Sequence, residues 1–222
     1  LRWDDMIKGK QPFETPERRQ ERINKMIHKI ETEKADASIA IGYGVVDATA
    51  ATTGQISSIA FPDNKEDIYL SWIGAGLGIG VVGGLTILFN HEQILLDIFE
   101  GWHYYRQYLE KNPLLKGNQI NTWNGRWISQ RYDREYDSDD PLMNFNPLVP
   151  MSDGLFNLHT VPRAEVIAGI ARNNRTSNMV GYLYSIGQTN TTVGFIPFKL
   201  QDIIRPSQLY AKIFGESVWM QN

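Results

Sequence analysis

The feature that constrains this chain most is an uncharged, glycine-rich run from Ile68 to Asn90. Six of its glycines lie within eleven residues, between positions 74 and 84, a density that disfavours an α-helix in water. Glycine at every second position puts the glycines of a strand on one face, and that bare face lets another backbone approach closely. The same alternation occurs at residues 41–46. We therefore expect a strand over residues 37–46 and a buried, glycine-faced strand within residues 68–89.

The glycine-rich run permits two other interpretations. Residues 69–89 are long enough to cross a membrane, and they contain a repeated G-x-x-x-G that is typical of helices packed in lipid. No cluster of Lys or Arg flanks them, which counts against a membrane-anchored protein. Alternatively, Gly78, Gly80 and Gly83 fit the G-x-G-x-x-G loop of nucleotide-binding enzymes. No second strand with an acidic end follows at the distance that such a site requires.

Capping residues and apolar periodicity predict the remaining elements. Thr15 and Pro16 start a helix over residues 15–34. The other expected elements are helices over 91–111, 162–173 and 200–214, strands over 179–184 and 193–198, and a loop with a short strand over 117–136. This mixture predicts an α+β fold, with mixed helices and antiparallel, glycine-rich strands. We expect an α+β domain over 1–136, an acidic, proline-containing linker over 137–154, and a C-terminal helix–hairpin–helix region over 155–222.

The composition excludes several classes of protein. The chain of 222 residues has no cysteine, so it has no disulfide framework, no thiolate catalyst and no thiolate-bound metal. Its four histidines are scattered, and no serine lies in a G-x-S-x-G elbow. We therefore expect no enzymatic activity, no cofactor and no bound metal. No basic segment followed by an apolar stretch begins the chain, so we expect no signal peptide and a cytoplasmic location.

Charge is distributed unevenly along the chain, although the net charge is only −3. Residues 36–100 are acidic, whereas residues 101–136 and 161–215 each carry an excess of Lys and Arg. This asymmetry suggests one surface that prefers polyanions and another that meets basic partner proteins.

Aromatic and basic residues alternate between Trp102 and Tyr136. Rings stack on bases and guanidinium groups hold phosphates, so this mixture is typical of nucleic-acid grooves. We expect Trp123, Arg126 and Arg131 to contact nucleic acid. The alternative is a core with its aromatic residues inside and its arginines outside.

The loop Ser185–Thr192 is polar, uncharged and rich in amides and hydroxyls. Its residues Gln188, Thr189 and Asn190 can offer donors and acceptors to base edges in a groove. The alternative is a solvated hairpin loop with no ligand. The basic residues near this loop, which we expect to hold phosphates, are Arg172, Arg175 and Lys199.

One stretch of the chain carries a resemblance to a known family. It runs from Asp153-Gly-Leu-Phe156 through Asn178 to Phe198, about a quarter of the chain, and it contains Gly-Tyr-Leu-Tyr-Ser-Ile-Gly-Gln-Thr-Asn-Thr-Thr-Val-Gly-Phe. This region resembles the C-terminal part of large subunits of type I CRISPR surveillance complexes (Cascade), most of all the myxobacterial and cyanobacterial subtype.

The resemblance implies a role in antiviral defence within a ribonucleoprotein complex. Such a subunit recognises the short motif beside the DNA target, helps to open the strands, and contacts guide RNA and sibling protein subunits. It implies a non-catalytic, DNA-binding and RNA-binding protein with no membrane partner, because a separate helicase–nuclease cuts the target. In that setting Trp123, Arg126 and Arg131 would contact a single strand or the guide.

Overall fold

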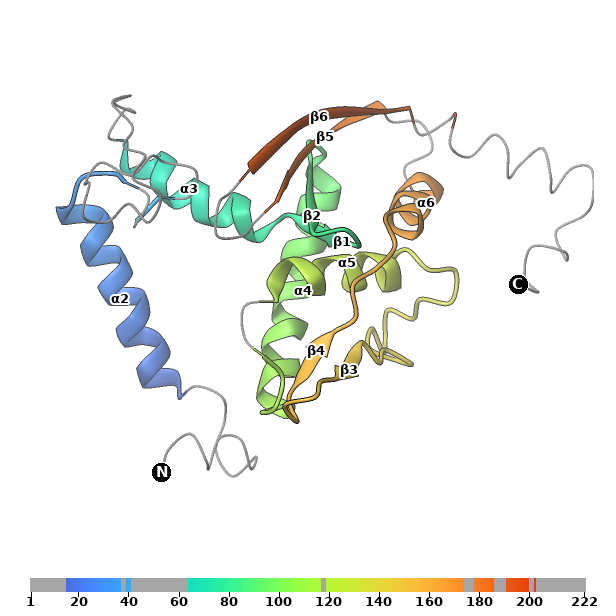
Figure 1. The fold of residues 1–222 in the computed structure, drawn as a ribbon, viewed down its shortest axis with the longest axis horizontal. Helices are drawn as coiled ribbons and strands as arrows, with labels where there is room; N and C mark the ends of the chain where they lie inside the picture. Colours follow the sequence, from blue (N-terminus) through green and yellow to red (C-terminus); the bar gives the residue numbers. More distant parts are fainter. Residues whose placement is uncertain are drawn as a thin grey trace, which may run out of the picture. The chain divides into compact units, whose positions relative to one another are not determined.

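The computed structural model describes residues 15–36, 39–40, 64–116, 119–173, 178–185, 191–199 and 202 (Figure 1). These residues form five helices, a four-stranded antiparallel sheet and a two-stranded sheet, so the expected α+β fold is confirmed. The helices are α2 (Pro16–Thr32), α3 (Lys65–Gly76), α4 (Glu92–Lys111), α5 (Ile120–Arg131) and α6 (Arg163–Asn173). The strands are β1 (Ile79–Val81), β2 (Leu85–Phe89), β3 (Leu148–Pro150), β4 (Phe156–Leu158), β5 (Asn178–Ser185) and β6 (Thr191–Lys199).

The chain divides into two compact units. The first comprises Leu1–Leu77 and Tyr108–Leu114, and the second comprises Gly78–Gln107 and Leu115–Asn222. The division near Gly78 therefore falls inside the glycine-rich run and not within residues 137–154.

In the first unit, helix α2 begins as its capping residues predict. The side-chain oxygen of Thr15 accepts a hydrogen bond from the backbone N–H of Arg18 at 3.3 Å, and Pro16 occupies the first helical position. The helix expected over residues 15–34 is thus confirmed. Ile30 of α2 and Ile68 of α3 are buried in the small core of this unit.

The glycine-rich run forms two kinds of structure, so the expectation of one glycine-faced strand over residues 68–89 is wrong in part. The run is helical up to Gly76, where α3 ends, and the hairpin of β1 and β2 follows. The chain reverses at Gly83 and Gly84, whose φ angles are +101° and +72°, values that glycine adopts without strain.

The structure also tests the two alternative interpretations of this run. The G-x-G-x-x-G interpretation is wrong, because strand β2 follows Gly83 where a phosphate loop requires a helix. Residues 69–89 do not form one continuous helix. None of the helices in the described residues combines the length and apolar character needed to cross a bilayer.

The bare glycine face that the alternation predicts is present in β1. A Cβ on Gly80 would lie 2.9 Å from the backbone carbonyl carbon of Asn121, so the backbone of α5 runs directly against this strand. The carbonyl oxygen of Gly78 accepts hydrogen bonds from the side-chain amides of Asn121 at 2.9 Å and Asn124 at 2.8 Å. Two asparagines therefore tie α5 to the start of β1. The similar segment 41–46 lies outside the described residues.

Helix α5 corrects the prediction of a loop with a short strand over residues 117–136. Trp123, Trp127 and Ile128 of this helix are fully buried. Asn124 is also fully buried and donates to Gly78, so a polar residue occupies a core position. Apolar periodicity therefore does not predict this helix, because the polar Asn124 interrupts the apolar pattern where the helix is most buried.

The other expected elements can be compared directly. Helices α4 and α6 confirm those predicted over residues 91–111 and 162–173. The expected linker 137–154 contains β3, which pairs with β4, and the ring of Phe145 packs 5.1 Å from that of Trp123. This segment therefore packs within the second unit. The helix expected over residues 200–214 lies outside the described residues, apart from position 202.

Candidate functional site

Strands β5 and β6 form the hairpin that the sequence predicts. They pair antiparallel, with Asn178 opposite Lys199 and Ser185 opposite Thr191. The strands expected over residues 179–184 and 193–198 are confirmed. The intervening loop residues lie outside the described part of the chain, and those predicted to contact bases are Gln188, Thr189 and Asn190.

The hairpin has one buried face and one exposed face, because alternate residues of a strand point to opposite sides. Met179 and Leu183 are each only 4% exposed, and they lie on the face that packs into the core. On the opposite face, Val193 is 58% and Phe195 is 72% exposed. We call this outer surface the hairpin face, and its members are Asn178, Val180, Tyr182, Tyr184, Val193, Phe195 and Lys199.

Three aromatic rings form a row on the hairpin face. Tyr182 lies directly opposite Phe195, and their ring centroids are 5.2 Å apart. Tyr184 lies two residues further along β5, and its ring is nearly parallel to that of Tyr182, with the centroids 5.3 Å apart. The row therefore runs along β5 and across to β6, where Phe195 is its most exposed ring.

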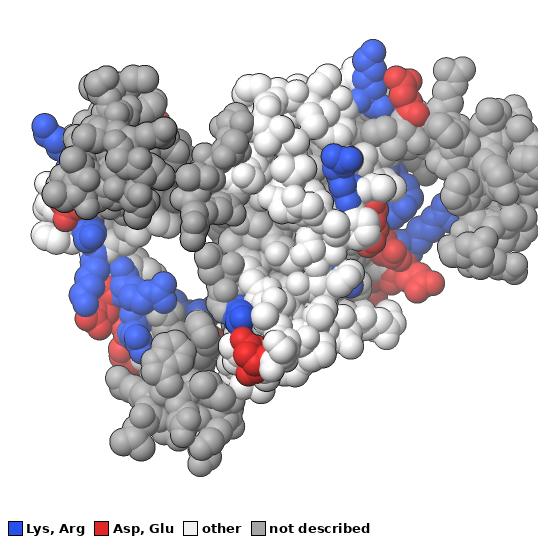
Figure 2. All heavy atoms as spheres, in the orientation of Figure 1, with Lys and Arg blue, Asp and Glu red and all other residues white. Residues whose placement is uncertain are grey.

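The charge of the hairpin face comes from one residue in the described strands. Lys199 is exposed at the end of β6, and neither β5 nor β6 contains an Asp or Glu among its described residues. Figure 2 shows that much of the visible surface of the second unit is uncharged, with Lys, Arg, Asp and Glu gathered toward its margins. A cation on the same hairpin as an exposed ring favours ligands that combine flat apolar groups with negative charge.

Two of the predicted arginines lie on helices and not on the hairpin. Arg172 belongs to α6 and donates through Nη2 to the backbone carbonyl of Tyr132 at 3.2 Å, so it supports the packing of α6. Arg126 is half-buried on α5. Arg175 lies outside the described residues. Of the predicted phosphate contacts, only Lys199 is shown on the same hairpin that carries the predicted loop.

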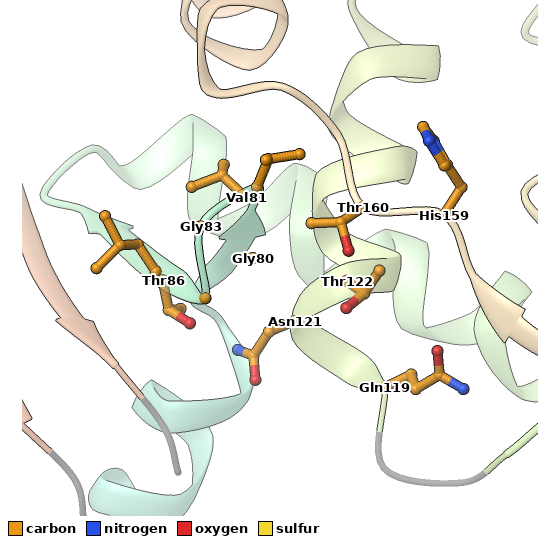
Figure 3. Close-up of a pocket in the computed structure, with 12 residues that line it drawn as sticks. Gly80, Val81, Gly83, Thr86, Gln119, Asn121, Thr122, His159 and Thr160 are labelled. Carbon is orange, nitrogen blue, oxygen red and sulfur yellow. The ribbon is translucent and has the colours of Figure 1, made fainter.

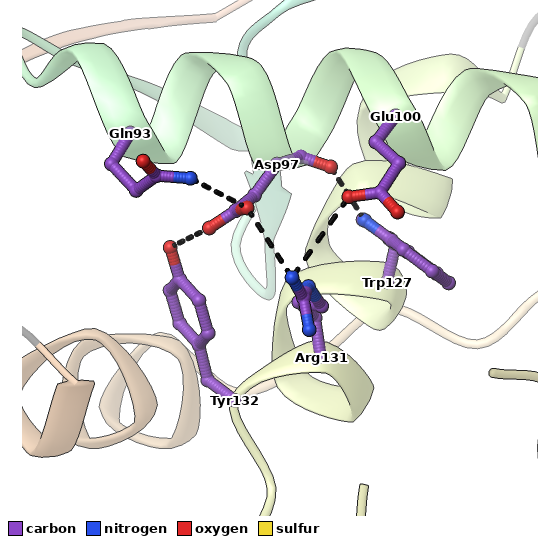
Figure 4. A network of polar contacts seen from close by, with 6 residues as sticks. All are labelled: Gln93, Asp97, Glu100, Trp127, Arg131 and Tyr132. Carbon is purple, nitrogen blue, oxygen red and sulfur yellow. Dashed lines mark hydrogen bonds and ion pairs between the residues drawn. The ribbon is translucent and has the colours of Figure 1, made fainter. Parts of the chain in front are cut away.

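Arg131 is engaged by two acidic neighbours, as Figure 4 shows, and by the ring of Tyr136. Its Nη2 lies 3.8 Å from Asp97 Oδ1 and 4.0 Å from Glu100 Oε2, and its guanidinium carbon lies 4.7 Å above the ring of Tyr136. Asp97 is buried and also accepts a hydrogen bond from the hydroxyl of Tyr132 at 2.5 Å. The guanidinium group therefore partly neutralises a buried carboxylate, a structural role that competes with binding a phosphate.

Trp123 does not present its ring to a ligand, which corrects the expectation that it contacts nucleic acid. The residue is fully buried, and its Nε1 donates to the backbone carbonyl of Gly101 at 2.9 Å. Trp127 is buried in the same way and donates to the carbonyl of Asp97 at 2.7 Å. The stretch between Trp102 and Tyr136 thus contributes its two central tryptophans to the core, as the alternative interpretation held.

The sequence analysis did not predict the row of rings on the hairpin face, although a signal for it exists. In β5 the small and aliphatic residues Met179, Gly181 and Leu183 alternate with Tyr182 and Tyr184. That alternation assigns the tyrosines to the outer face once the aliphatic residues are assigned to the core.

No protein-family model, curated protein or solved structure matches this chain. The resemblance to the large subunits of type I surveillance complexes therefore stays a prediction that rests on residues 153–198.

Proposed function

We propose that this chain is a non-catalytic nucleic-acid-binding protein, and that the hairpin face holds single-stranded nucleic acid. The observation that carries the proposal is the exposure of Phe195, at 72%, directly beside Tyr182 in a row of rings on the hairpin that also carries Lys199. Such a surface matches the chemistry of an unpaired strand, because each nucleotide has a flat base and an anionic phosphate.

The energetics support a single strand over a duplex. Stacking of a base on an aromatic side chain contributes about 1–3 kcal/mol per base, and it requires a base whose face is free. The bases of a duplex already stack on one another, so a row of rings on a sheet gains little from them. Lys199 adds an attraction for phosphate that weakens as salt rises.

The finer proposal follows the family resemblance. In it, the chain is a subunit of an RNA-guided DNA-targeting complex of the Cascade type, bound to guide RNA, target DNA and sibling protein subunits. Gln188, Thr189 and Asn190 then probe the motif beside the target, while the hairpin face holds a neighbouring unpaired strand. The confirmed pairing of β5 with β6 supports this arrangement, because the same two strands carry the loop and the rings.

Fluorescence anisotropy with the 222-residue chain tests the proposal. A labelled single-stranded oligonucleotide and its duplex are titrated at several salt concentrations, in both DNA and RNA form. The single strand is expected to bind at least about 10-fold more tightly than the duplex. Lys199→Ala is expected to reduce the slope of log affinity against log salt by about one. Equal affinity for both forms would contradict the role of the exposed rings.

A further inference from the structure

A polar cavity of about 550 Å³ lies in the second unit beside the turn between β1 and β2 (Figure 3). One wall is the turn itself, including Gly83 and Gly84. A second wall is the first turn of α5, with Asn121 and Thr122, and residues 159–160 close a third side. A cavity of this size falls within the range of sites that hold small ligands or single nucleosides.

Three threonines supply hydroxyl groups to this cavity. Thr86, Thr122 and Thr160 line it, and their hydroxyls have no hydrogen-bond partner among the described residues. A hydroxyl can both donate and accept. The cavity therefore suits a ligand that itself carries donors and acceptors.

The amides that line the cavity are already engaged and form rigid walls. Asn121 donates to the carbonyl of Gly78 at 2.9 Å. Gln119 donates to the carbonyl of Lys116 at 2.8 Å and accepts from the N–H of Leu158 at 2.7 Å. The threonine hydroxyls are thus the adaptable groups, and the asparagine and glutamine side chains fix the shape.

The lining favours a neutral ligand. No Asp, Glu, Lys or Arg is present among the described residues that line the cavity, and His159 is the ionisable side chain among them. A phosphate or carboxylate would find no permanently charged cation there, whereas a neutral heterocycle such as a nucleobase would meet hydroxyls and the backbone of the glycine turn.

Tyr184 connects the cavity with the hairpin face. A Cβ on Gly78 would collide with the hydroxyl of Tyr184 and with the methyl group of Thr86. The same Cβ would lie 3.2 Å from Nδ2 of Asn121. Thr86 lines the cavity and lies directly opposite Tyr184 in the pairing of β2 with β5. The ring of Tyr184 in turn stacks on Tyr182. The pairing of Thr86 with Tyr184 therefore joins the cavity to the row of rings through the sheet.

We propose that this cavity accepts one uncharged nucleobase of a strand whose neighbouring bases lie on the hairpin face. The inference rests on the proposed function, and it adds base selectivity to it. The rings bind any base by its face, whereas the hydroxyls of Thr86, Thr122 and Thr160 meet the edge of the one base that leaves the row.

Free nucleosides test the cavity independently of strand binding. Adenosine, guanosine, cytidine and uridine are titrated into the chain, and the NMR signals of the methyl groups of Thr86, Thr122 and Thr160 are followed. At least one nucleoside is expected to give saturable shifts, and glucose at the same concentration is expected to give none. Thr122→Val keeps the shape of the side chain and removes its hydroxyl. It is therefore expected to lower the affinity for that nucleoside about 3- to 10-fold.

Homopolymeric oligonucleotides then separate the two proposals. Phe195→Ala is expected to weaken the binding of all these oligonucleotides by a similar factor. Thr122→Val is expected to reduce the ratio of affinities between the tightest-bound and the weakest-bound oligonucleotide by about 3- to 10-fold. Oligonucleotide binding without any nucleoside shifts at the threonines would overturn the cavity proposal and leave the proposed function intact. Nucleoside binding without oligonucleotide binding would overturn the proposed function instead. Equal shifts with glucose would overturn the assignment to a nucleobase.

Discussion

Helix α5 passes strand β1 at a point where glycine faces glycine. A Cβ on Gly125 would lie 2.5 Å from the carbonyl oxygen of Gly80, closer than such atoms approach in folded proteins. This contact positions the first turn of α5, and with it Asn121 and Thr122, against the hairpin of β1 and β2. The cavity described above therefore depends on the absence of a side chain at position 125.

Gly125→Ala is expected to destabilise the second unit by about 1–3 kcal/mol, because the added methyl group forces α5 away from a backbone carbonyl. Gly169→Ala in α6 is the matched control. A Cβ there would lie 3.4 Å from Cβ of Tyr132, an ordinary contact, and alanine favours a helix by roughly 0.5–1 kcal/mol over glycine. Urea unfolding followed by tryptophan fluorescence measures both variants. Equal effects in the two variants would show that α5 is not closely packed on β1.

Tyr132→Phe removes the hydroxyl that donates to the buried carboxylate of Asp97. A hydrogen bond to a buried charged group contributes about 1.5–3 kcal/mol, so a loss of that size in the free energy of unfolding is expected. The comparison is Tyr69→Phe, which removes an exposed hydrogen bond to Glu31 and is expected to lower the free energy of unfolding much less than Tyr132→Phe does. If Tyr132→Phe were as mild as Tyr69→Phe, the Asp97 network would contribute nothing to stability.

Alkaline pH is expected to weaken the fold through Tyr184. Burial first, and the neighbouring Tyr182 second, raise the pKa of Tyr184 to about 12 from its ordinary value of 10.0. Because the folded state holds this proton more tightly than the unfolded state, the stabilisation is fully present below pH 10 and is lost between about pH 10 and 12. Allowing for partial exposure of the ring, the loss is roughly 1–2 kcal/mol.

Tyr184→Phe isolates this contribution from the other tyrosines. The difference in unfolding free energy between the original chain and this variant is expected to change by roughly 1–2 kcal/mol between pH 9 and 11.5. A difference that stays constant with pH would mean that the phenol of Tyr184 titrates as it does in the unfolded chain.

The loop of the hairpin gives a prediction specific to the finer proposal. Alanine at both Gln188 and Asn190 is expected to weaken binding to duplex DNA that carries the recognised motif by about 10-fold or more, since one good contact with a base edge contributes about 1–3 kcal/mol. Binding to unrelated duplex is expected to change little. Competition assays with the assembled complex measure both affinities, and an equal loss in both would remove the claim of base readout.

The fold could be predicted from the sequence where local chemistry decides the structure. Thr15 and Pro16 start α2, and alternating residues define β5 and β6, because these signals act within a few residues. Helix α5 could not be predicted in this way. Its buried Asn124 is satisfied by the carbonyl of Gly78, which lies 46 residues earlier in the chain, and no local pattern contains that partner.

The candidate site divides in the same way. The hairpin, with Lys199 at its end, could be predicted because a run of alternating residues flanked by a polar loop is a local pattern, whereas the phosphate contact of Lys199 stays a prediction. Trp123 and Arg131 are residue types that are common in nucleic-acid grooves. In the structure, however, Trp123 is buried and Arg131 is paired with Asp97. Burial and ion pairing are set by packing between α4 and α5, so composition alone does not separate a binding residue from a core residue.

The most direct test of the central claim compares two exposed phenylalanines. Phe195 on the hairpin face is 72% exposed and Phe99 on α4 is 59% exposed, so replacing either by alanine removes little packing. Binding of a labelled single-stranded oligonucleotide is measured by anisotropy for both variants and the original chain. Phe195→Ala is expected to weaken binding about 5- to 150-fold, the equivalent of about 1–3 kcal/mol, while Phe99→Ala leaves it unchanged. Equal affinities for the two variants would contradict the assignment of the hairpin face as the site that holds the strand.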